Sequence, residues 1–115
     1  MRSQMVVRAW EQTEAEVEVG STVDLVLTRP VAIPPRLGCE WPAAPQIAGA
    51  SVRFAGRRIE HPPADVDGGV ATLHYDFEAV EPGLSRVLLT AIPASAEAVC
   101  PPVRLDLSVR SASSR

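Results

Sequence analysis

The sequence predicts a single all-β domain, folded as an antiparallel sandwich of seven to eight short strands. Apolar and polar residues alternate with a period of two along most of the chain, as expected for strands with one buried and one solvated face. Glycine- and proline-rich turns interrupt this alternation about every ten residues, which is typical of a sandwich. A chain of 115 residues suits one domain, expected at 1–110, with a frayed tail at 111–115.

The first half of the chain contains the clearest alternation. Glutamates alternate with Ala15, Val17 and Val19, which predicts a strand with one wet face, and Gly20 then begins a turn. Prolines in 29–38 fix φ and remove backbone donors, so this stretch is expected to be a loop. Residues 42–50, rich in Pro, Ala and Gly, are expected to be a connection. The strands expected here are 5–10, 13–19, 22–28 and 39–41.

The second half follows the same pattern. The strand at 51–57 should place Val52, Phe54 and, beyond it, Ile59 inward, before a polar loop at 60–69. The longest strand, 70–80, carries Leu73, Tyr75, Phe77 and Ala79 on one face. A Glu-Pro-Gly turn precedes the strand at 85–92, which is apolar on both faces, including Ile92, and is expected to be central. Residues 93–102 form a second Pro/Ala-rich loop before a last alternating strand, 103–109.

The charges exclude several classes of partner. Fourteen acids and eleven bases give a net charge of −3, and every base is arginine. The bases form no stripe, which argues against a nucleic-acid partner and against an anionic membrane surface. No apolar run is long enough to span a membrane. The chain as it stands is expected to be cytoplasmic, or secreted or periplasmic if a signal peptide has been removed.

Two pairs of chemically active residues were considered as sites. Cys39 and Cys100 have no metal-ligand spacing, so both a disulfide and two free thiols remain open. His61 and His74, with nearby acids of the loop 60–69, are expected to lie on a solvated face and in a polar loop. We therefore expect no metal, no cofactor and no catalytic residue, and the chain is not expected to be an enzyme.

The order of these features resembles the chagasin-like inhibitors of papain-type cysteine peptidases. The family's first loop, Asn-Pro-Thr-Thr-Gly followed by an aromatic residue, any residue and Trp, corresponds here to residues 34–41, Pro-Pro-Arg-Leu-Gly-Cys-Glu-Trp. Gly68 and Gly69 fall on the second loop, Gly-x-Gly-Gly. Pro93 falls on the third, Arg-Pro-Trp. The resemblance covers about residues 12–110.

This resemblance implies an immunoglobulin-like sandwich that engages a protein partner, possibly a papain-like cysteine peptidase, through three loops at one end. Most of the polar and aromatic residues of the family's loops are replaced here, so the alternative is an immunoglobulin-like interaction or assembly module without peptidase inhibition. The residues implied to contact the partner are Pro34, Pro35, Arg36, Leu37, Gly38, Asp67, Gly68, Gly69, Ile92, Pro93 and Ala94.

Overall fold

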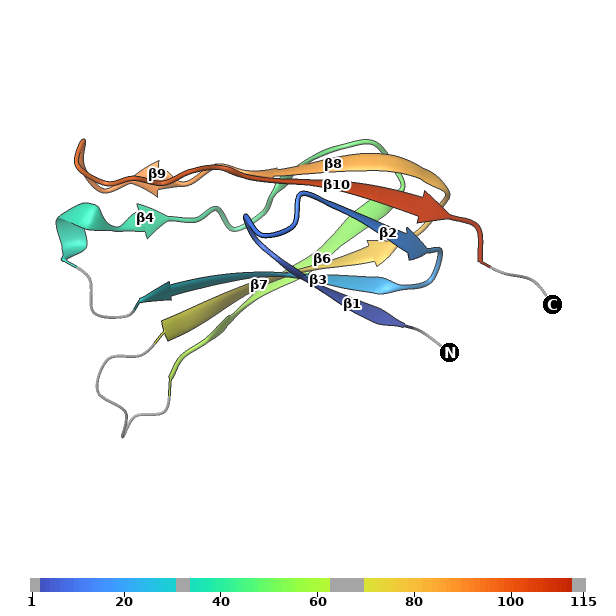
Figure 1. The fold of residues 1–115 in the computed structure, drawn as a ribbon, viewed down its shortest axis with the longest axis horizontal. Coiled ribbons are helices and arrows are strands. Elements are labelled where there is room, and N and C mark those ends of the chain that lie inside the picture. Colours follow the sequence, from blue (N-terminus) through green and yellow to red (C-terminus); the bar gives the residue numbers. More distant parts are fainter. Residues whose placement is uncertain (1–2, 31–33, 63–69, 113–115) are drawn as a thin grey trace.

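The computed structural model of the protein describes residues 3–30, 34–62 and 70–112. These residues form ten strands and one 3₁₀ turn, η1 (Figure 1). The elements in chain order are β1 (Gln4–Arg8), β2 (Glu14–Glu18), β3 (Thr22–Pro30), η1 (Pro35–Leu37), β4 (Cys39–Glu40), β5 (Gln46–Ala48), β6 (Val52–Glu60), β7 (Val70–Ala79), β8 (Gly83–Leu89), β9 (Ile92–Pro93) and β10 (Val103–Arg110).

The strands form two packed layers. Sheet A has the order β1-β3-β7-β6, and sheet B has the order β2-β10-β8-β5. A two-stranded ribbon of β4 and β9 lies at the end of the molecule opposite the two termini (Figure 1). The all-β sandwich expected from the alternation is therefore confirmed. The described residues include no helix long and apolar enough to cross a membrane.

The first two strands join different sheets. β1 pairs in parallel with β3, and β2 pairs in parallel with β10, whereas the other pairings are antiparallel. The short connection between them must therefore cross from one sheet to the other. Trp10 lies in this crossing with φ of 66°, a region that non-glycine residues seldom adopt.

The core is filled by alternate residues from both sheets. Leu73, Tyr75, Phe77 and Ala79 of β7 are all buried, as expected from the sequence. Each large apolar side chain buried in this way contributes about 1.5–3 kcal/mol. The other fully buried large side chains are Leu25, Leu27, Leu89, Leu105, Leu107, Val7, Val23, Val87 and Val103.

A bulge in β6 sets which of its residues face the core. The register with β7 shifts between Phe54 and Gly56. In a regular strand Phe54 and Ile59, five residues apart, would face opposite sides, but the bulge places both on the inward side. Ile59 pairs in register with Leu73 but remains 41% exposed. The layers lie farther apart at this end of the sandwich, so an inward-facing side chain there is not fully covered (Figure 1).

Other expected boundaries differ from the structure. The connection 42–50 contains β5, whose three residues are too few to show an alternation. Within the loop expected at 29–38, residues 29–30 belong to the end of β3 and residues 35–37 form η1. Ile92, expected in a central strand, lies in β9 and is 66% exposed, because β8 ends at Leu89 and the chain then leaves the core.

Substituting Gly49 tests the turn between β5 and β6. Gly49 has φ of 108°, and a Cβ there would lie 2.5 Å from the carbonyl oxygen of Leu84. Gly20 also has a positive φ, 94°, but its Cβ would meet nothing within 4 Å. We expect Gly20→Ala to cost about 1–2 kcal/mol of unfolding free energy and Gly49→Ala about 3 kcal/mol or more, measured by urea denaturation. Equal losses would contradict the steric account.

Candidate partner-binding end

The β4–β9 ribbon brings two distant segments side by side. Cys39 pairs with Pro93, and Glu40 pairs with Ile92. The pairing continues one residue further, because the amide of Ala94 donates to the carbonyl of Gly38 at 3.0 Å. Two of the three loops implied by the sequence resemblance therefore meet in one unit. We call residues 34–40 and 92–100 the ribbon end.

The first segment of the ribbon end is a proline-started 3₁₀ turn. Pro35 occupies its first turn, where a missing backbone donor costs nothing and a fixed φ favours the bend. The amide of Leu37 donates to the Pro34 carbonyl at 2.9 Å, and that of Gly38 donates to the Pro35 carbonyl at 3.1 Å. The prolines therefore hold the turn in one shape before any partner arrives.

The second segment folds against this turn through side chains. The Ser95 hydroxyl donates to the carbonyl of Arg36 at 2.5 Å and accepts from the Glu97 amide at 3.2 Å. Arg36 forms an ion pair with Glu97 at 3.1 Å. Both charged side chains are about two-thirds exposed, so this pair contributes little stability. Its main effect is to orient the two segments.

A disulfide closes the ribbon end. Cys39 and Cys100 are bonded, with their Cα atoms 5.8 Å apart and a sequence separation of 61. Of the two alternatives left open by the sequence, the structure has the bond. The bond joins β4 to the chain that follows β9, so neither segment of the ribbon can move far from the other.

The base of the ribbon is attached to the sandwich. The Trp41 ring is buried and packs edge-on against Trp10, with ring centroids 5.7 Å apart. Tyr75 of sheet A donates its hydroxyl to the Pro42 carbonyl at 2.5 Å. Arg57 reaches the carbonyls of Trp41 and Pro42 at 3.3 and 3.4 Å. The ribbon is therefore an extension of the core and not a free hairpin.

The ribbon end also exposes apolar side chains. Ile92 and Val99 are the most exposed large apolar residues in the described part of the chain, at 66% and 84%, and Leu37 is 37% exposed. Such side chains, held on rigid backbone, are suited to burial against a partner. Arg36 and Glu97 provide a polar rim beside them.

The structure places the residues singled out in the sequence as follows. The ribbon end unites the first group, Pro34, Pro35, Arg36, Leu37 and Gly38, with the third, Ile92, Pro93 and Ala94. Asp67, Gly68 and Gly69 lie outside the described residues. The strand ends before and after them, Glu60 and Val70, lie at the same end of the sandwich as the ribbon (Figure 1).

Sequence reasoning missed three residues of the ribbon end: Ser95, Glu97 and Val99. The Ser-x-Glu spacing, in which a serine hydroxyl accepts from the amide two residues on, was a signal for the local turn. The ion pair with Arg36 had no signal, because it depends on the pairing of segments about sixty residues apart.

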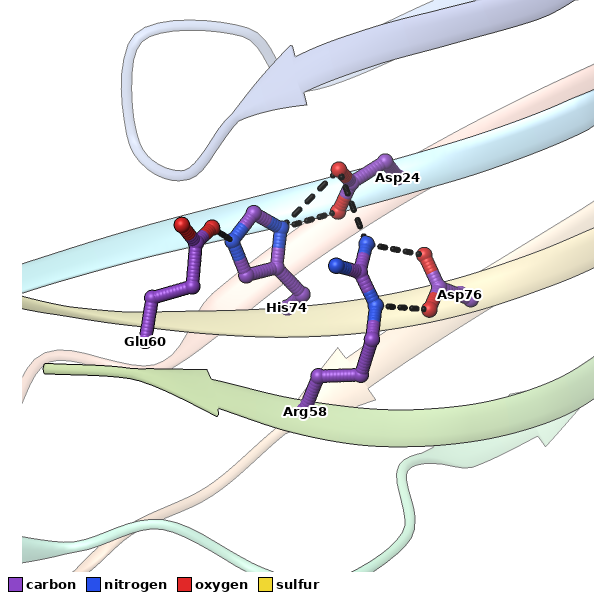
Figure 2. A network of polar contacts seen from close by, with 5 residues as sticks. All are labelled: Asp24, Arg58, Glu60, His74 and Asp76. Carbon is purple, nitrogen blue, oxygen red and sulfur yellow. Dashed lines mark hydrogen bonds and ion pairs between the residues drawn. The ribbon is translucent and has the colours of Figure 1, made fainter.

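A second polar cluster lies on the outer face of sheet A (Figure 2). It consists of Asp24, Arg58, Glu60, His74 and Asp76. His74 is only 8% exposed, so the expectation of a solvated face there was wrong: neighbouring charged side chains cover the ring. Within the described ranges, no group of three or more His, Cys, Asp or Glu residues is arranged to hold a metal ion.

Solved structures with the same architecture are found. The cysteine protease inhibitor EhICP2 from Entamoeba histolytica superposes with a TM-score of 0.66 at 11% identity, covering 95% of this chain and 97% of that one. Amebosin superposes with a TM-score of 0.60 at 14% identity, covering 93% of this chain and 98% of that one. PbICP-C, solved in complex with falcipain-2, superposes with a TM-score of 0.63 at 9% identity, covering 92% of this chain and 99% of that one. The chain has the fold of the chagasin-family cysteine protease inhibitors. No family model and no curated protein matches its sequence.

Removing the disulfide tests how much the ribbon end depends on it. On the chain-entropy model, a loop of this length stabilises the protein by about 4 kcal/mol. We expect the double variant Cys39→Ser/Cys100→Ser to lose an amount of that order in urea denaturation. Dithiothreitol should lower the unfolding free energy of the wild type to that of the variant and leave the unfolding free energy of the variant unchanged. A wild type that is insensitive to the reductant would contradict this.

Tyr75 should make stability pH-dependent at high pH. Burial raises the pKa of the Tyr75 hydroxyl, and the nearby Arg57 guanidinium lowers it by a smaller amount. Since the folded state holds this proton more tightly, its stabilising effect is complete below the unfolded value of about 10 and is lost as pH rises through the folded pKa.

Because this is the only tyrosine of the chain, tyrosinate absorbance follows its titration without ambiguity. Tyr75→Phe should be about 1 kcal/mol less stable near pH 8, through loss of the hydrogen bond to Pro42. The difference in unfolding free energy between wild type and variant should shrink above about pH 10. A constant difference across this range would refute the assignment.

Proposed function

We propose that this chain is a protein-binding domain that inhibits papain-like cysteine peptidases by placing the ribbon end in or near the active-site cleft. The observation that carries the proposal is that two of the loops implied to contact a partner form one unit, which is cross-linked by a disulfide and exposes apolar side chains. The fold is that of cysteine protease inhibitors, and one protein with this fold was solved in complex with falcipain-2.

Preorganisation supports inhibition by binding. A loop that is already ordered loses less conformational entropy when it enters a cleft. The 3₁₀ turn, the ribbon hydrogen bonds and the disulfide each restrict the ribbon end before binding. Ile92, Val99 and Leu37 would then supply the apolar contacts that become buried.

The proposal includes no chemistry by this chain. Three polar side chains of the ribbon end are engaged within it: Arg36 pairs with Glu97, and the Ser95 hydroxyl binds the backbone of both residues. A hollow of about 670 Å³ lies over sheet B, away from the ribbon end, and is lined by residues such as Arg86 and Asp106, which pair at 3.4 Å. Neither place has the convergent, water-excluded polar groups that catalysis requires.

A second candidate function is an interaction or assembly module without peptidase inhibition. It is favoured by the residues of the loops themselves: Arg36 and Leu37 stand where the chagasin-like loop has two threonines, and Ala94 stands where it has tryptophan. The ribbon end would then bind a different protein. Isolation of a stable partner other than a peptidase, through the same surface, would support this second function.

Charge substitution at the ribbon end tests the proposed function. We expect the wild type to inhibit papain, and Ile92→Asp or Val99→Asp to weaken inhibition at least about tenfold, because each places a charge in a buried contact. Leu84→Asp is the matched control, since Leu84 is 53% exposed and is the second residue of β8, a strand that begins at the opposite end of the sandwich (Figure 1).

The assay should use the lowest thiol concentration that keeps papain active, because the disulfide of the ribbon end is sensitive to reduction. If the wild type at about 100 µM does not inhibit papain, its dissociation constant is too high for an inhibitor, and peptidase inhibition is ruled out. Equal inhibition by all variants would instead place the contact elsewhere on the domain.

A further inference from the structure

The polar cluster on sheet A is unusual for an outward-facing surface. Asp24 of β3 and His74 of β7 lie on the outer face of the sandwich, yet they are only 5% and 8% exposed. Ionisable side chains are rarely covered to this degree unless they are paired. The bulge in β6 is what covers them, because it turns Arg58 and Glu60 onto the same face.

His74 lies between two carboxylates (Figure 2). Its Nδ1 is 2.9 Å from each carboxylate oxygen of Asp24, and its Nε2 contacts Oε1 of Glu60. Arg58 binds Asp76 with its Nε at 2.8 Å and its Nη2 at 3.2 Å, and Nη2 also reaches Asp24 at 3.4 Å. Asp24 is thereby shared between the histidine and the arginine.

These contacts depend on the protonation state of the ring. Ionised carboxylates only accept hydrogen bonds, so both contacts are satisfied together only when both ring nitrogens carry a proton. In the neutral ring one nitrogen has a lone pair that faces a carboxylate. Asp24 is buried and further held by Arg58, whereas the Glu60 side chain is 65% exposed, so Glu60 is the partner that the neutral ring releases.

We propose that His74 is a positioning residue for the partner-binding end of the domain: as an imidazolium it fastens Glu60, the last residue of β6, to sheet A. β6 ends at the same end of the sandwich as the ribbon, opposite the two termini (Figure 1). Loss of the ring proton frees this strand end and weakens partner binding. The effect on binding rests on the proposed function; the fastening of Glu60 does not.

The other charged groups on this face do not replace the contact. Arg8 lies in the same row across the sheet, but Val26 lies between it and His74. Arg53 is paired with Glu78 at 2.5 Å. His61 follows Glu60 directly and is exposed. Glu60 is therefore the group whose position responds to the ring proton, and His61 provides a matched control.

The first test follows the fastening itself by NMR, without any partner. Near pH 5.5, both ring nitrogens of His74 should be protonated, and the amides of Ile59 and Glu60 should exchange slowly. At a higher pH, at which NMR shows that the ring has lost one of these protons, their exchange relative to the intrinsic rate should rise several-fold. Glu60→Gln should remove this pH dependence, because an amide side chain can donate to or accept from the ring. A ring with only one protonated nitrogen near pH 5.5 would overturn the proposal.

The second test measures binding to a papain-like peptidase whose catalytic cysteine is replaced by alanine, so that no reductant is needed. Wild type and His61→Gln should bind about threefold to fivefold more weakly at the pH where NMR shows a neutral ring than near pH 5.5, the size expected from a partly exposed ion pair. Glu60→Gln and His74→Gln should lose this component of the pH profile, while any titration of the peptidase affects all four proteins alike.

The outcomes separate the two proposals. Binding by all four proteins with one common pH profile would overturn the positioning role of His74 and leave the proposed function standing. Absence of binding at any pH would overturn the proposed function and the positioning role with it, while the NMR result would still decide whether Glu60 is fastened.

Discussion

The candidate site depends on a covalent constraint between segments that are distant in the sequence. The disulfide between Cys39 and Cys100 closes a loop that contains two of the four strands of each sheet. Without it, β4 and β9 would be held by two residue pairs and by the few polar contacts of the flanking residues, and two-stranded ribbons of this length are at best marginally stable in water. The bond therefore turns two chain connections into one rigid projection. It also places a redox requirement on the domain, because such a bond persists only where the surroundings are oxidising.

The rest of the ribbon end takes its position from the core. Trp41 continues β4 into the sandwich, and Tyr75 and Arg57 bind the carbonyls that follow it. Arg57 is an inward-facing residue of β6, at the end where the layers lie apart (Figure 1). A charged side chain is tolerated there because its Nη1 donates to two backbone carbonyls, which gives those carbonyls a partner.

How far the sequence predicts this protein depends on the range of the interactions. The long strands are predictable because Leu73, Tyr75 and Phe77 alternate with polar residues, and alternation is a local signal. The bulge in β6, the crossing at Trp10 and the three-residue β5 are not, since each is set by pairing with a distant strand. The same limit applies to the site: Pro34 and Pro35 indicated a rigid loop, but the contact of Arg36 with Glu97 exists only once β4 and β9 have paired.

His74 illustrates why an outward-facing position in a strand does not imply a solvated one. Alternation places His74 opposite Leu73 and Tyr75, which is correct. Its burial follows from a one-residue insertion in a neighbouring strand, which brings Arg58 and Glu60 onto the same face. Three carboxylates then surround one guanidinium and one imidazole, and a proton on the ring lowers the excess of negative charge from two to one. Both the charge balance and the hydrogen-bond geometry around the ring depend on Arg58 and Glu60, and therefore on the bulge between Phe54 and Gly56.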